Sequence, residues 1–143
     1  MNVKATFSNG DLDEEVYMRQ PKGFVVPGQE HRVCKLLKSL YGLKQAPKQW
    51  HQKFHKVVFK NDFHINDANK CVYTKFTSDK GVIVCLFVDD MLICGTNLKR
   101  VENTKIYLSQ NFDMKDLGKT NVILGNKITQ ADNGLMLSQL HYI

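Results

Sequence analysis

The sequence predicts an α+β fold in which an antiparallel sheet carries two helices on one face. The expected elements occur in the order strand, helix, paired strands, helix and strand. Apolar residues recur at helical spacing in two stretches, whereas the candidate strands are short and end at turn residues. With 143 residues, of which 43% are hydrophobic, the chain is long enough for one domain with its own core.

The N-terminal part of the chain is expected to contain short extended segments separated by loops. Residues 3–7 are predicted to form a short strand, and the Asn9-Gly10 pair that follows predicts a turn. Residues 16–18 and 32–37 are further candidates for extended structure. Between them, residues 19–30 contain two prolines and two glycines, so they are predicted to form a loop.

A helix is predicted to begin at Pro47 and to end near Asn61. Proline is well suited to the first helical position because its missing N–H would have no partner there in any case. One face of this helix is apolar and holds Trp50, Phe54, Val57 and Val58. A different face holds Lys53, Lys56 and Lys60.

The middle of the chain predicts a set of paired strands. Residues 71–76 are expected to form a strand that is followed by a turn at 78–81. Residues 82–87 and 91–94 are apolar throughout, which is typical of central strands covered on much of both faces.

A second helix is predicted after these strands, with Thr96 or Asn97 as its N-cap. Its core face is expected to hold Leu98, Val101, Leu108 and Phe112. A break follows at 116–118. Residues 122–128 and 135–137 then predict a last hairpin, which turns at Asp132-Asn133-Gly134.

Positive charge is concentrated in one segment of a chain whose net charge is +6. Residues 31–60 contain eight lysines and arginines and no acidic residue, so the rest of the chain is net negative. Such a segment indicates either a polyanionic partner, with nucleic acid as the first candidate, or a solvated lysine-rich face. The charge pattern alone does not decide between them.

The four cysteines are predicted to be free thiols in a reducing compartment, because no Cys-x-x-Cys pair or zinc-like spacing occurs. Cys85 and Cys94 would lie directly opposite each other if the loop between their strands were Asp89-Asp90. They would be offset if the loop were Val88-Asp89.

No apolar run reaches the roughly 18 residues that span a bilayer, and the N-terminal residues form no apolar signal region. The expectation is therefore an intracellular, cytoplasmic protein with no signal peptide and no transmembrane segment.

Two adjacent carboxylates, Asp89 and Asp90, interrupt the apolar run of residues 82–95. Burial of an ion without a partner is costly, so a divalent metal is one explanation for the pair. The alternative is a plain turn, because aspartate favours turns by bonding to nearby backbone N–H groups.

A longer string around this pair, Phe87-Val88-Asp89-Asp90-Met91, resembles the Tyr-Val-Asp-Asp-Met box of copia-type retrotransposon reverse transcriptases. The resemblance extends over nearly the whole chain. Residues 39–50, Ser-Leu-Tyr-Gly-Leu-Lys-Gln-Ala-Pro-Lys-Gln-Trp, are especially specific. Further similar segments are 11–18, 20–24, 33–38, 112–118 and 122–125.

The resemblance implies RNA-directed DNA polymerisation by a ferredoxin-like palm with two Mg²⁺ ions. Two-metal phosphoryl transfer requires carboxylates that converge on the ions. By resemblance, Asp89 and Asp90 are two catalytic, metal-binding residues, and the turn lies at Val88-Asp89. The third position is Asn2, because residues 2–10 match the family's Asp-Val-Lys-Thr-Ala-Phe-Leu-Asn-Gly.

Asparagine at this position is expected to impair the metal site, because its amide carries no negative charge. A retained α-ammonium on Met1 would add a positive charge near the expected cations, and residue 2 would lie on a frayed terminus.

Further roles follow from the resemblance residue by residue. Phe7, Tyr41 and Gly42 correspond to nucleotide-binding positions, with Phe7 as the aromatic that excludes a ribose 2′-hydroxyl. Gly125 corresponds to the primer grip. The lysine face of the first helix, Lys53, Lys56 and Lys60, is expected to contact backbone phosphates. Each of these residues also has a structural explanation that does not need the resemblance. Phe7 would be a core aromatic, Tyr41 and Gly42 a turn, Gly125 a strand bulge, and the lysines a solvated face.

The resemblance therefore implies that residues 1–143 form a partial palm domain, with most of the fingers, the thumb, RNase H and integrase outside it. Its partners would be an RNA template, a DNA primer and deoxynucleoside triphosphates, with no membrane. The isolated chain is expected to be inactive as a polymerase. The alternative is a non-catalytic nucleic-acid-binding remnant of a decayed retroelement, and the oligomeric state is left open.

Overall fold

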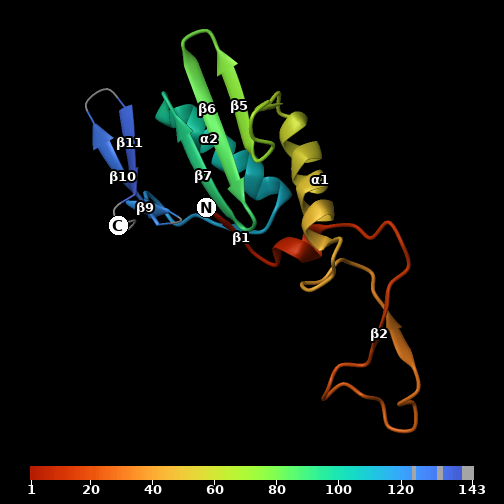
Figure 1. Cartoon of the computed structure of the whole chain (residues 1–143). Coiled ribbons are helices and arrows are strands. Elements are labelled where there is room, and N and C mark those ends of the chain that lie inside the picture. The colour runs from red at the N-terminus through yellow and green to blue at the C-terminus, as the bar shows by residue number, and fades with distance from the viewer. Residues whose placement is uncertain (124, 132–133, 140–143) are drawn as a thin grey trace. The chain divides into compact units, whose positions relative to one another are not determined.

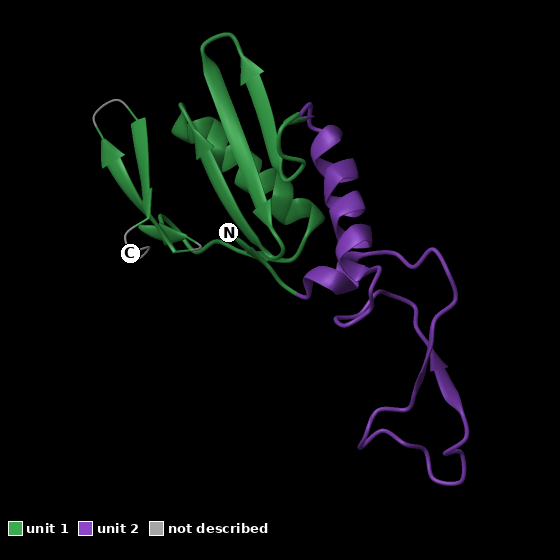
Figure 2. Cartoon of the chain, in the orientation of Figure 1, with its two compact units in different colours: residues 1–4, 65–143 green, residues 5–64 purple. Residues whose placement is uncertain are grey.

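The computed structural model describes residues 1–123, 125–131 and 134–139. Figure 1 shows its helices and strands. The chain divides into two compact units, one made of residues 1–4 and 65–143 and the other of residues 5–64 (Figure 2). The prediction that residues 1–143 act as one palm domain stays a prediction.

The first unit contains most of a six-stranded sheet with the order β4-β5-β6-β7-β1-β8. Its strands are β1 (Asn2–Val3), β4 (His64–Ile65), β5 (Val72–Thr77), β6 (Lys80–Phe87), β7 (Asp90–Gly95) and β8 (Met114–Lys115). The pairs β5–β6, β6–β7, β7–β1 and β1–β8 are antiparallel. The short β1 therefore lies between β7 and β8, which places the start of the chain inside the sheet.

The strand β6 has one face that is more deeply buried than the other. Val82, Val84 and Leu86 are buried, whereas Ile83 and Phe87 are 36% and 53% exposed. The prediction that this strand is covered on both faces is therefore wrong for the face that holds Ile83 and Phe87. Its neighbour β5 contributes Tyr73, which is fully buried, and desolvation raises the pKa of its phenol to about 12.

Helix α2 (Leu98–Asn111) packs against β6 and β7 (Figure 1). Leu108 and, just after the helix, Phe112 are buried at 1% and 3% exposure, as predicted. Leu98 is 79% exposed, so its predicted place in the core is wrong. It is the first residue of the helix, and Thr104 is instead the other buried residue of α2.

Asn97 is the N-cap of α2, and its side-chain oxygen accepts a hydrogen bond from the Arg100 backbone N–H at 3.2 Å. Replacing Asn97 by alanine is expected to lower the free energy of unfolding by about 1 kcal/mol, because that N–H loses its side-chain acceptor. Urea denaturation measures this change. Asn97→Asp keeps the acceptor and should remain near the parent, so an equal loss in both variants would contradict the capping role.

A separate three-stranded sheet has the order β11-β10-β9, with β9 (Val122–Ile123), β10 (Asn126–Ala131) and β11 (Gly134–Gln139). The predicted single strand over 122–128 is wrong, because β9 and β10 pair antiparallel with Ile123 opposite Asn126. Gly125 supports this reversal with a φ of +76°. The hairpin β10–β11 is confirmed. The predicted turn residues Asp132 and Asn133 lie outside the described residues.

The second unit contains η1 (Thr6–Asn9), β2 (Tyr17–Arg19), β3 (Val33–Lys35) and α1 (Ala46–Phe59). The extended segments predicted at 16–18 and 32–37 are present as β2 and β3, and these two strands pair with each other. The predicted strand over 3–7 is wrong beyond Val3. The chain reverses at Ala5, which has a φ of +46°, and then forms the short 3-10 helix η1.

Helix α1 begins at Ala46, one residue before the predicted start at Pro47, and it confirms the predicted apolar face. Pro47 lies in its first turn, and Trp50, Phe54 and Val58 are at most 2% exposed. Trp50 and Phe54 contact each other with ring centroids 5.7 Å apart. Val57 is only half-buried. The helix ends at Phe59, two residues before the predicted end.

The α+β class, with a mostly antiparallel sheet and two helices, is confirmed. The ferredoxin-like palm topology, with both helices on one face, stays a prediction. Among the described residues no helix is long and apolar enough to cross a membrane.

Candidate active site

The tip of the β6–β7 hairpin presents Asp89 and Asp90. Phe87 is paired with Asp90, so the connecting residues are Val88 and Asp89, as predicted. Val88 has a φ of +54°, which is strained for a β-branched residue, and strain of this kind is common at functional sites. The same register pairs Cys85 with Leu92 and Cys94 with Ile83, so the two cysteines are offset.

Asn2 is held against this tip by backbone hydrogen bonds on both sides of it. The Val3 N–H donates to the Asp89 carbonyl and the Met91 N–H donates to the Met1 carbonyl, both at 2.8 Å. Asn2 is thereby placed opposite Asp90 in the β1–β7 pairing. The structure thus brings together the three predicted catalytic positions, although they are far apart in sequence.

The side chain of Asn2 makes an amide bridge, which we define as its Nδ2 group donating to both carboxylates. The distances are 3.2 Å to Asp89 Oδ2 and 3.0 Å to Asp90 Oδ1. Carboxylates only accept hydrogen bonds when ionised, so the amide must present its N–H₂ group to them rather than its oxygen. All three side chains are half-buried, so solvent competes only partly with these bonds.

The Met1 amino group lies beside the same tip and donates to the Met91 carbonyl at 2.9 Å. Its pKa is lowered from the usual value, chiefly because burial desolvates the charged form, while Asp116 and Asp90 act in the opposite direction.

The residues at the tip do not fit a pair of divalent cations in this arrangement. Magnesium requires several oxygen ligands in a near-octahedral set. Here two carboxylates are available, and the third group supplies no anionic oxygen but directs N–H bonds at one oxygen of each carboxylate. Within the described part of the chain, no cluster of three His, Cys, Asp or Glu side chains could hold a metal ion.

Two of the predicted nucleotide-binding residues lie together in the second unit. The rings of Phe7 and Tyr41 have centroids 5.4 Å apart and are tilted by 45°. Phe7 is half-buried, whereas Tyr41 is 88% exposed. The adjacent Gly42 has a φ of +93°, a conformation that side chains other than glycine rarely adopt. The pair therefore joins a half-buried ring of η1 to an exposed ring beside the turn at Gly42.

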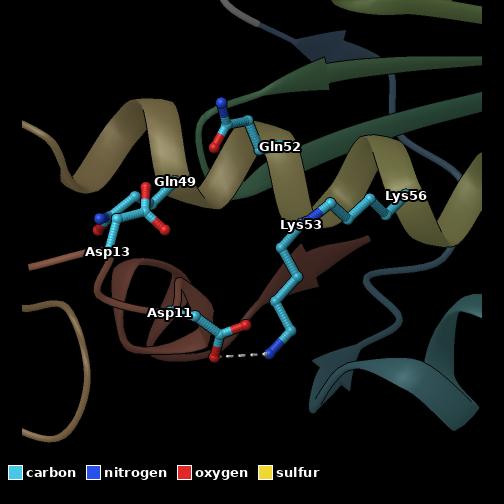
Figure 3. Close-up of a pocket in the computed structure, with 6 residues that line it drawn as sticks. All are labelled: Asp11, Asp13, Gln49, Gln52, Lys53 and Lys56. Carbon is cyan, nitrogen blue, oxygen red and sulfur yellow. Dashed lines mark ion pairs between the residues drawn. The ribbon is translucent and has the colours of Figure 1, made fainter.

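Two of the three predicted phosphate-binding lysines lie beside acidic residues. Lys53 and Lys56 line a small polar pocket with Asp11, Asp13, Gln49 and Gln52 (Figure 3). The Asp11 carboxylate is 3.7 Å from Lys53 Nζ and 2.6 Å from Lys38 Nζ. The hydrogen bond from Lys38 is the main cause that lowers the pKa of Asp11, and Lys53 adds to it. Lys60 lies at the C-cap of α1 and is exposed.

Asp11 was not among the residues that the sequence singled out. A signal was available, because the acidic run 11–15 precedes a segment with eight cations and no acid. Glu15 pairs with Lys35 in the same way. Part of the basic segment is therefore neutralised within its own unit.

Gly125 lies in the reversal between β9 and β10, where a Cβ atom would meet no other atom within 4 Å. Its positive φ explains the glycine on conformational grounds alone. Its predicted role in the primer grip stays a prediction.

A sequence model of the family described as reverse transcriptase (RNA-dependent DNA polymerase) matches residues 1–143. The chain belongs to the reverse transcriptase family. No solved structure matches the chain significantly.

Curated relatives of the chain are proteins of copia-type transposons. The Retrovirus-related Pol polyprotein from transposon TNT 1-94 of Nicotiana tabacum is 48% identical over the whole chain, which corresponds to 11% of that polyprotein. The polyprotein from transposon RE1 of Arabidopsis thaliana is 35% identical over the whole chain, and the match covers 10% of that polyprotein. The putative transposon Ty5-1 protein of Saccharomyces cerevisiae is also 35% identical over the whole chain, and the match covers 47% of that protein. The chain thus spans about a tenth of the two polyproteins and about half of the Ty5-1 protein.

Proposed function

We propose that the chain is the reverse transcriptase segment of a copia-type Pol polyprotein, and that Asn2 leaves its nucleotidyl transfer strongly impaired. The observation that carries this proposal is the amide bridge, which fills the place where a third carboxylate would be. Asp89 and Asp90 are the two remaining catalytic carboxylates, which bind metal in the family's site. Because the residues do not fit two Mg²⁺ ions, a metal-assisted transfer step is not part of the proposal for this chain.

The other site residues take part in binding under this proposal. Phe7, Tyr41 and Gly42 contact the incoming deoxynucleoside triphosphate, and the exposed ring of Tyr41 is available for stacking. Gly125 contacts the DNA primer. Lys56 and Lys60 bind backbone phosphates of the RNA template or DNA primer, and Lys53 does so when it is released from Asp11. None of these contacts requires the missing carboxylate.

Primer extension on an RNA template tests the proposal directly. The chain is incubated with a DNA primer, the four deoxynucleoside triphosphates and Mg²⁺, and products are resolved by length. We expect no extension above the background of an Asp89→Asn Asp90→Asn double variant. Templated products from the parent chain at a rate well above that control would contradict the proposal.

A second candidate function is binding of nucleic acid without catalysis, for which the basic segment at 31–60 is the specific observation. Binding through lysines and arginines is sequence-independent and weakens as salt is raised, because counterions are released. Titration of a fluorescent RNA–DNA duplex at several salt concentrations measures both properties. Absence of binding at low salt would exclude this function.

Removal of the Asp11 charge is expected to strengthen duplex binding. Asp11→Asn releases Lys38 and Lys53, so about two more cations become available to phosphates. We expect the affinity at low salt to rise roughly three- to tenfold. The slope of log affinity against log salt concentration should become steeper by about one to two. The matched control is Asp79→Asn, which removes the same charge from an exposed turn. An equal gain in both variants would show that only net charge matters.

A further inference from the structure

We infer that the Asn2 amide takes the place of a bound cation at the hairpin tip and makes the folded chain independent of Mg²⁺. The inference rests on the proposed assignment of Asp89 and Asp90 as metal-binding carboxylates. It goes beyond the loss of a ligand, because it assigns Asn2 a positive role in stabilising the site.

The geometry supports this role because one donor group serves both anions. Asp89 and Asp90 are adjacent in sequence, half-buried, and both accept from Asn2 Nδ2, at 3.2 and 3.0 Å. Two like charges this close repel each other, and a bound cation is the usual compensation. The N–H₂ group of an amide has two protons with partial positive charge, so it can direct one to each carboxylate.

The backbone fixes the amide in this position. Asn2 lies in β1 with β7 on one side and β8 on the other, opposite Asp90 and Lys115. The backbone bonds of Val3 and Met91 flank it. The bridge therefore forms as a consequence of strand pairing, and little additional ordering is needed to make it.

The bridge and a bound cation compete for the same two carboxylates. Asp89 Oδ2 and Asp90 Oδ1 accept from Nδ2, and Asn2 can join the coordination of Mg²⁺ only if its amide rotates to offer its oxygen. That rotation breaks both hydrogen bonds. Mg²⁺ thus competes with an internal donor that is already in place, and this competition weakens its binding.

The test compares the parent chain with Asn2→Asp by thermal unfolding, in EDTA and in millimolar MgCl₂. For the parent we expect a Tm that differs by less than about 1 °C between the two conditions. For Asn2→Asp we expect a Tm about 3–6 °C below the parent in EDTA, because a third negative charge replaces the donor, and recovery of most of this loss in MgCl₂.

Two controls separate the possible causes. Asp89→Asn and Asp90→Asn introduced together into the Asn2→Asp chain should abolish the response to MgCl₂. Gln110→Glu adds the same charge at an exposed position of α2. The Tm of this variant should be the same in EDTA and in MgCl₂. If Asn2→Asp does not fold in EDTA, recovery of its circular dichroism signal on addition of MgCl₂ gives the same readout.

Binding of Mn²⁺, followed by electron paramagnetic resonance, provides a second measurement that does not depend on stability. We expect at least tenfold tighter binding to Asn2→Asp than to the parent. Equal Mg²⁺ stabilisation and equal Mn²⁺ affinity in the two chains would overturn the amide bridge as a substitute for a cation. Absence of any metal response in Asn2→Asp would instead overturn the proposed metal-binding role of Asp89 and Asp90.

Discussion

Replacing Asn2 by aspartate within a complete Pol polyprotein that carries this segment is expected to raise the rate of templated primer extension about a thousandfold. This factor corresponds to ~4 kcal/mol of transition-state stabilisation. The reason is electrostatic. The amide now directs N–H groups at Asp89 and Asp90, and aspartate would supply a third anionic ligand at the same place in the sheet.

The measurement is single-nucleotide extension of a DNA primer on an RNA template, with the rate determined under single-turnover conditions. Gln110→Glu in the same polyprotein is the matched control, because it adds one negative charge away from the hairpin tip. The reciprocal change, from aspartate to asparagine at the matching position of an active relative, should cause a loss of similar size. A rate that stays at the parent's level in the Asn2→Asp polyprotein would show that another defect dominates.

Replacing Leu108 by alanine is expected to lower the free energy of unfolding by about 3 kcal/mol. Leu108 is 1% exposed on the face of α2 that packs against β6 and β7, so its truncation removes buried apolar surface and leaves a cavity. Urea denaturation followed by circular dichroism measures the change.

The same substitution at Leu98, on the same helix, is the matched control. Leu98 is 79% exposed, and its replacement by alanine is expected to change the free energy of unfolding by less than about 0.5 kcal/mol. Equal losses from the two variants would contradict the packing described here, whereas a large loss from Leu108 alone supports it.

This pair of leucines also shows how far periodicity predicts a core. Spacing correctly placed Leu108 and Phe112 inside, because residues at helical intervals share a face. It placed Leu98 wrongly: at 3.6 residues per turn, Leu98 lies roughly 80° around the helix axis from Leu108, at the edge of the buried face. The N-cap at Asn97 makes Leu98 the first helical residue, where the helix has just begun.

The N-terminal strand shows a different kind of error. Residues 3–7 have strand-like composition, yet only Asn2 and Val3 pair with neighbouring strands before Ala5 adopts a left-handed conformation. The length of β1 is set by long-range bonds, such as that from the Lys4 N–H to the Asp113 carbonyl. Local sequence carries no information about such a partner 109 residues away.

The sequence indicated which residues form the candidate site better than it indicated how they interact. Resemblance gave Asn2, Asp89 and Asp90 as one set, and the turn at Val88-Asp89 followed from it. The amide bridge did not follow, because it depends on the register between strands 88 residues apart in sequence. The ion pair between Asp11 and Lys53 was missed for the same reason, since the charge pattern alone left the basic segment unassigned.

The amide bridge has a genetic consequence. Codons for aspartate and asparagine differ by one base, so a single transition interconverts the two states of residue 2. Under the inference above, the asparagine state still yields a folded chain, and quality control that degrades unfolded proteins would not remove it. Copies of the element that carry this change would persist in a genome with a folded product, each one base away from the aspartate codon.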